Sequence, residues 1–77
     1  MEKKVYLVSA DWCTNCKPVK NLISEKELDV TYIDAEEQPE IPSQFGIMSL
    51  PSIVDNRSDN PNVYKGQTEC LQFVNTL

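Results

Sequence analysis

Apolar and polar residues follow two different periods along this chain, and the two periods predict its secondary structure. Short β-branched and aromatic runs, bounded by charged or turn-forming residues, are typical of strands. Four such runs occur, at Val5–Ser9, Val30–Asp34, Ser52–Asp55 and Asn62–Lys65. Apolar residues spaced three and four positions apart predict helices over residues 15–26, 41–45 and 68–77.

The order of these elements predicts one α/β domain over residues 1–77. The first strand, helix and second strand form a βαβ unit, whose two strands are parallel with a right-handed crossover. Residues 56–61 are turn-forming, so the last two strands form a hairpin. Pro18 fits the first turn of a helix that begins near Asn15, where no N–H donor is needed. A helix that began earlier would be kinked at this proline.

The length and net charge of the chain exclude several classes of protein. A chain of 77 residues has room for only a small core. Its net charge of −5 argues against binding to nucleic acid or to anionic membrane surfaces. Its apolar runs are too short for a membrane span or for the core of a signal peptide. We therefore expect a location in the cytoplasm, and we also expect a monomer.

Two cysteines, Cys13 and Cys16, lie where the first strand meets the first helix. Residues three apart share a helix face, so the two sulfurs can meet. The unpaired N–H groups of a helix N-terminus favour a thiolate and lower its pKa from ~8.5 into a range of about 3.5 to 7.5. In a reducing compartment such a pair is more often catalytic than structural. The pattern favours redox chemistry.

Two other uses of the cysteine pair are open. A zinc site needs about four ligands, and the chain offers no histidine and only one further cysteine, Cys70. A structural disulfide would close so short a loop that it removes little chain entropy. We therefore expect no metal.

The third cysteine, Cys70, has a different predicted role. It shares an apolar helical stripe with Phe73, Val74 and Leu77, which predicts a buried structural thiol.

Two blocks of the sequence resemble thioredoxins. Ala10-Asp11-Trp12-Cys13-x-x-Cys16-Lys17 is similar to their active-site signature. Ile33-Asp34, Gln44-Phe45-Gly46-Ile47 and Leu50-Pro51-Ser52 follow one another like the thioredoxin run that ends in a cis-proline. The length is that of glutaredoxins and small glutaredoxin-like redoxins. The resemblance covers about residues 5–77 and implies a minimal thioredoxin fold, a four-stranded mixed sheet in the order β-α-β-α-β-β-α with three helices.

The resemblance also implies roles for individual residues. Cys13 would be the exposed attacking thiolate, and Cys16 the resolving thiol that releases the reduced substrate from a mixed disulfide. Five residues would contact the substrate: Trp12, Thr14, Leu50, Pro51 and Gly66.

Three of these contacts have a physical basis that the resemblance supplies. Trp12 would offer an apolar docking surface beside the sulfurs. Pro51 would be cis and pack against the cysteines, and the Leu50 backbone would pair with an extended substrate. Trp12 could instead be an ordinary half-buried aromatic residue, and Pro51 a trans proline that starts an edge strand.

The chain departs at three places from the families it resembles. Thr14-Asn15 stands between the cysteines, and Leu7 stands where thioredoxins bury an aspartate. Glutaredoxins hold glutathione with a glycine-rich, aspartate-bearing turn before the last helix, of which residues 65–69 keep one glycine, Gly66, and one acid. Glutathione binding therefore stays open.

These observations together predict a dithiol–disulfide oxidoreductase that reduces protein disulfides without a bound cofactor. Its partners would be a disulfide-containing protein and a donor of electrons, either a thioredoxin-reductase-type protein or glutathione as co-substrate. One alternative is a glutathione-dependent glutaredoxin. Another is a non-enzymatic adaptor that docks a partner through Trp12, Leu50 and Pro51, although an adaptor needs no cysteine pair.

Overall fold

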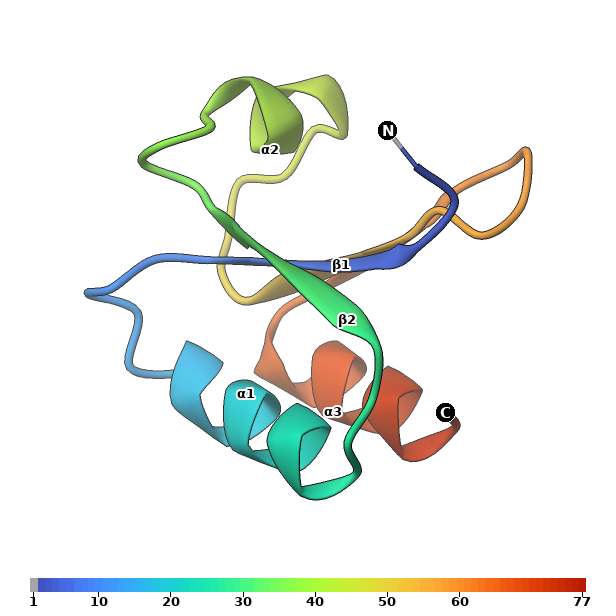
Figure 1. The fold of residues 1–77 in the computed structure, drawn as a ribbon. Coiled ribbons are helices and arrows are strands. Elements are labelled where there is room, and N and C mark those ends of the chain that lie inside the picture. The colour runs from blue at the N-terminus through green and yellow to red at the C-terminus, as the bar shows by residue number, and fades with distance from the viewer. Residues whose placement is uncertain (1) are drawn as a thin grey trace.

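The computed structural model describes residues 2–77 and shows seven helices and strands within that range (Figure 1). The strands are β1 (Val5–Ser9), β2 (Val30–Asp34), β3 (Ser52–Asp55) and β4 (Asn62–Lys65). The helices are α1 (Cys16–Glu25), α2 (Glu40–Gln44) and α3 (Gln67–Asn75). All four strands have the predicted bounds. Within the same range, no helix is long and apolar enough to cross a membrane.

The four strands form one mixed sheet in the order β2-β1-β3-β4. β1 pairs with β2 in parallel and with β3 antiparallel, and β3 and β4 form the antiparallel hairpin. This is the topology that the resemblance implied, with β1 and β3 as the inner strands.

Helices cover both faces of this sheet. In Figure 1, α1 and α3 lie side by side on one face and α2 lies on the other. All of β1 is buried, and its successive side chains enter opposite layers. Val5 and Leu7 join the core under α1 and α3, whereas Tyr6 and Val8 join the core on the side of α2.

The helices differ from their predicted bounds by one or two residues at each end. α1 begins at Cys16, and Pro18 lies in its first turn, as a late start of this helix predicts. α3 begins one residue early because Gly66, at φ +91°, turns the chain directly into it.

α2 ends in a Schellman motif. Gly46 has a φ of +65°, and the Ile47 N–H donates to the Pro42 carbonyl at 2.8 Å. The Gly46 N–H donates to the Ser43 carbonyl at 3.3 Å. The helix therefore covers Glu40–Gln44 instead of residues 41–45, and the predicted stop at Gly46 is confirmed.

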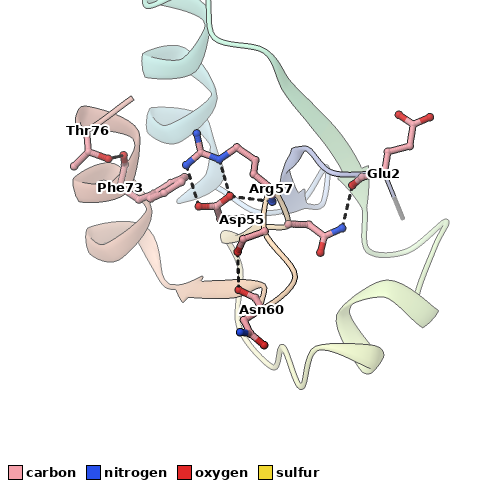
Figure 2. A network of polar contacts seen from close by, with 8 residues as sticks. Glu2, Asp55, Arg57, Asn60, Phe73 and Thr76 are labelled. Atoms are coloured by element: carbon pink, nitrogen blue, oxygen red, sulfur yellow. Dashed lines mark hydrogen bonds and ion pairs between the residues drawn. The ribbon is translucent and has the colours of Figure 1, made fainter.

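A polar network closes the end of the sheet that lies farthest from the cysteine pair (Figure 2). Arg57 donates to both carboxylate oxygens of Asp55, at 2.7 and 3.0 Å. Its guanidinium carbon lies 5.9 Å from the centre of the Phe73 ring, which stacks on Tyr64. The network joins the β3–β4 hairpin to α3.

Candidate active site

The cysteine pair lies at the junction of β1 and α1. After β1 ends, the chain turns, and the Cys13 N–H donates to the Ala10 carbonyl at 3.0 Å. A second turn brings the Cys16 N–H to 3.2 Å from the Cys13 carbonyl, and Cys16 begins α1. The two sulfurs are joined in a disulfide, with the Cα atoms 5.4 Å apart. The sequence spacing thus brings the two thiols together at a helix N-terminus.

The two cysteines differ less in exposure than the resemblance implied. Cys13 was expected to be exposed, but in this disulfide form only 6% of it is exposed, against 1% of Cys16. The reason is packing, since both cysteines form a small apolar cluster with Ala10, and Leu50 lies against it. Cys13 is still the more accessible of the two.

Pro51 lies in the interior of the protein and follows Leu50, which packs against the cysteine pair. The Leu50–Pro51 peptide bond is cis, and the proline is fully buried. β3, which follows it, is an inner strand, so the alternative of a trans proline on an edge strand is wrong. The Pro51 carbonyl accepts a hydrogen bond from the Gly66 N–H at 2.9 Å and a weaker one from the Cys70 thiol at 3.6 Å.

Gly66 therefore acts here through its backbone geometry. Its φ of +91° is one that side chains disfavour, and its N–H already donates to Pro51. This N–H is therefore not free to donate to a substrate, and the predicted substrate contact at Gly66 stays a prediction.

Trp12 and Thr14 lie at the surface on either side of Cys13. Trp12 is 65% exposed, so the alternative of a half-buried aromatic residue is wrong. Its indole N–H donates to the carboxylate of Glu36, whose own N–H donates to the Asp34 carboxylate at 2.8 Å. The sequence did not point to Glu36, because an acidic loop gives no signal of which carboxylate reaches the tryptophan. Thr14 is exposed in the turn and open to a partner.

A largely apolar groove of about 440 Å³ lies between Trp12 and the segment that leads into Pro51. Its lining consists of Trp12, Ala35, Pro42, Ile47, Met48, Ser49 and Leu50. Met48 is 97% exposed, and the sequence analysis missed it. The signal was present, since an extended segment that buries Ile47 turns the next side chain outward, and that side chain is apolar.

The surroundings of the two sulfurs are apolar. Leu7, at the position of the thioredoxin aspartate, is fully buried. Among residues 2–77, the buried polar or charged residues are Ser9, Ser52 and Asp55, and Asp55 lies at the far end of the sheet. The described part of the chain therefore places no buried carboxylate beside Cys16.

The third thiol is in a different environment. The predicted burial of Cys70 is confirmed, and this burial raises the pKa of its thiol to about 12. Its sulfur lies 3.5 Å from the Tyr64 carbonyl as well as near Pro51. Across residues 2–77, no three histidine, cysteine or acidic side chains gather where they could hold a metal ion.

The sequence and the fold were compared with those of known proteins. The family model described as Thioredoxin matches residues 2–77. Thioredoxin from Rickettsia bellii is 37% identical over 51 residues, which cover 58% of this chain and 49% of that protein. Thioredoxin from Alicyclobacillus acidocaldarius is 36% identical over 58 residues, which cover 68% of this chain and 55% of that protein. The chain thus spans about half the length of the curated relatives it matches.

Solved structures agree on the fold. The germline-specific thioredoxin Deadhead from Drosophila melanogaster superposes with a TM-score of 0.76 at 21% identity, over 97% of this chain and 79% of that chain. Thioredoxin 1 from Thermosipho africanus has a TM-score of 0.70 at 19% identity, over 95% of this chain and 88% of that chain.

Proposed function

Because the chain belongs to the thioredoxin family, we propose that it is a dithiol–disulfide oxidoreductase that reduces disulfides in other proteins. One observation carries this proposal. The Cys13–Cys16 disulfide lies at the start of α1 and borders Leu50, which also lines the apolar groove. Sulfurs that can exchange and a surface that can hold a polypeptide are therefore adjacent.

The reaction follows from the order of the cysteines. In the reduced protein, the Cys13 thiolate attacks one sulfur of the substrate disulfide, a mixed disulfide forms, and the other substrate sulfur leaves as a thiolate. Cys16 then loses its proton and attacks the Cys13 sulfur, which releases the second substrate thiolate. The substrate gains two electrons and the protein returns to the disulfide form described above.

The helix supplies the electrostatic part of this chemistry. The first N–H groups of α1 have no partner within the helix, and their partial positive charge stabilises a thiolate beside them. The first turn of α1 contains no acidic residue that would oppose this effect, and Lys17 follows Cys16 directly. We therefore expect the pKa of the Cys13 thiol to lie below its ordinary value of ~8.5.

The groove supports docking of an extended peptide. Within residues 2–77, neither the N–H nor the carbonyl of Leu50 makes a hydrogen bond to another backbone group. Both groups are therefore available to pair with substrate main chain, while Trp12 and Met48 offer apolar contact beside them. Thr14, which follows Cys13 in the chain, is exposed as well.

The alternatives gain no support. Nothing in the fold or in the relatives favours a glutathione-dependent glutaredoxin, and Gly66 has no free N–H for glutathione. An adaptor would not need the cysteine pair. The proposed electron donor is a thioredoxin-reductase-type protein or glutathione, and the proposed setting is a monomer in the cytoplasm.

Single cysteine variants test the roles. The Cys13→Ser variant should lose all disulfide reduction, because the attacking sulfur is gone. The Cys16→Ser variant should trap substrate on Cys13 as a stable mixed disulfide, visible by mass spectrometry of the intact adduct. Trapping by Cys13→Ser instead would reverse the assignment.

A second experiment identifies the electron donor. The rate at which a thioredoxin reductase reduces the oxidised protein is compared with the rate of reduction by glutathione.

A further inference from the structure

The segment that borders the apolar groove, called the acidic wall below, is rich in carboxylates although the residues that line the groove itself carry none. No lysine or arginine occurs between Lys26 and Arg57. In the part of that interval around the groove, residues 34–50, the chain carries four carboxylates and no basic side chain: Asp34, Glu36, Glu37 and Glu40. The charge of this segment is therefore −4, which is most of the net charge of −5 of the whole chain.

These carboxylates are placed at the groove by the residues between which they lie. Ala35 and Pro42 both line the groove, and the chain between them carries Glu36, Glu37 and Glu40, all exposed. Glu36 reaches the opposite wall, where its carboxylate accepts the indole N–H of Trp12. Asp11, also exposed, precedes Trp12 directly. An apolar lining thus lies between acidic side chains.

The basic residues near the cysteines do not belong to this wall. Lys17 and Lys20 are on α1, and the Lys20 amine lies 5.9 Å from the centre of the Tyr32 ring on β2. The groove residues come instead from the loop before α1 and from residues 35–50. Neither lysine is among the residues that line the groove.

We propose that this groove selects disulfide-containing partners whose segment next to the reacting cysteine carries an apolar side chain together with lysine or arginine. This inference rests on the proposed function. An acidic cleft raises the encounter rate of basic partners and lowers that of acidic ones, and like charges opposed across an interface are costly. A second copy of this chain is a poor occupant, because both copies carry a charge of −5.

Two synthetic peptides of equal length test the selection. Each contains one intramolecular disulfide with a leucine beside a cysteine, and they differ only in two flanking lysines or two flanking glutamates. The reduced protein is mixed with each peptide and the second-order rate of thiol release is measured at low and high salt. We expect the lysine peptide to react about tenfold faster at ~0.02 M salt, and the ratio to approach one at about 1 M.

A pair of double variants with the same change in charge separates a local from a global effect. Glu37→Gln with Glu40→Gln neutralises the wall, and neither side chain makes a hydrogen bond or ion pair within residues 2–77. Glu25→Gln with Glu27→Gln neutralises two exposed carboxylates at the far end of α1. The first pair should reduce the preference for the lysine peptide several-fold, and the second should leave most of it.

The neutral disulfide of hydroxyethyl disulfide makes the outcomes separable. If it is reduced while the two peptides react at equal rates, the charge selection is wrong and the proposed function stands. If the two double variants weaken the preference equally, the acidic wall is not its cause and the inference fails. If neither peptide nor hydroxyethyl disulfide is reduced, both proposals fail together.

Discussion

The three cysteines of this chain carry the same side chain, and their surroundings decide what each can do. Cys13 lies before the first turn of a helix, where the partial positive charge favours a thiolate. Cys70 lies in the core between α3 and β3, where burial raises the pKa of its thiol to about 12. We therefore expect that, at neutral pH in the reduced protein, the Cys13 thiol reacts and the Cys70 thiol stays protonated and inert.

The raised pKa of Cys70 should make the free energy of unfolding depend on pH in the alkaline range. The pKa of Cys70 is raised in the folded state, so its contribution is fully present below the unfolded value of ~8.5 and is lost as the pH rises toward 12. The free energy of unfolding of the oxidised protein should fall across this window by on the order of 1 kcal/mol per pH unit more than that of a Cys70→Ala variant. Chemical denaturation at pH 7, 9 and 10 measures the difference.

The same variant has an expected cost at neutral pH. Cys70→Ala should keep disulfide reduction and lose about 1 kcal/mol of unfolding free energy, the scale of a small truncation in the core.

The burial of Cys70 also predicts the order in which the thiols are labelled. In the native reduced protein, an alkylating reagent should modify Cys13 quickly and Cys70 only after denaturation. Equal labelling rates in the folded state would contradict the inert role of Cys70.

For the helices and strands, the local pattern of residue types in the sequence determined which bounds could be predicted. The strands agree with the predicted bounds because their β-branched runs end at charged or turn residues, which is information within the sequence itself. The ends of helices depend on backbone geometry at single residues, such as the positive φ of Gly66, and were missed by one or two positions. The cysteine pair was located by its spacing, and Leu50 and Pro51 by family resemblance.

The remaining site features could not be predicted because they depend on which loop residues meet. The bond between Trp12 and Glu36 joins positions 24 residues apart, and any of three neighbouring acids could have made it on sequence grounds. The exposed position of Met48 depends on the path of the chain after α2. Such contacts follow from the assembled fold and have no periodic signal.

The polar contacts between the β3–β4 hairpin and α3 should contribute to the stability of the protein, and a variant at Arg57 tests this. Arg57 lowers the pKa of Asp55 chiefly through their hydrogen bonds, and Asp55 is largely buried. The Arg57→Gln variant should lose about 1 kcal/mol at pH 7, because a buried carboxylate loses its partner and Phe73 loses the guanidinium beside it. Lys65→Gln removes the same charge from an exposed side chain without an ion pair among residues 2–77 and should cost less than about 0.5 kcal/mol.

The pH dependence of that loss has a defined sign. The folded pKa of Asp55 is depressed, so the contribution of the pair is present above the ordinary aspartate pKa of about 4 and is lost as the pH falls through the folded value. The gap in unfolding free energy between the native protein and Arg57→Gln should therefore shrink as the pH falls below about 4. A gap that stays constant in acid would show that Asp55 is not the partner that matters.

For the whole molecule, the core and the redox site are separate clusters. The two larger apolar clusters lie on opposite faces of the sheet and contain neither Cys13 nor Cys16. The cysteine pair packs with Ala10 and Leu50 at the end of the sheet where β1 finishes, and Leu50 also packs against the cluster on the side of α2. The proposed electron carrier must stay folded in both redox states, and this separation provides a reason why it should.

Reduction of the disulfide should therefore leave the fold intact. The cross-link joins residues three apart, and closing so short a loop restricts the unfolded chain by no more than about 2 kcal/mol. For a domain of this size that corresponds to a fall in Tm of at most about 15 °C. Far-UV circular dichroism of the reduced protein at 25 °C should match that of the oxidised protein. A variant with both Cys13→Ser and Cys16→Ser, which cannot form the cross-link, should melt close to the reduced protein. Loss of structure on reduction at 25 °C would mean instead that the active-site pair is the staple on which this small core depends.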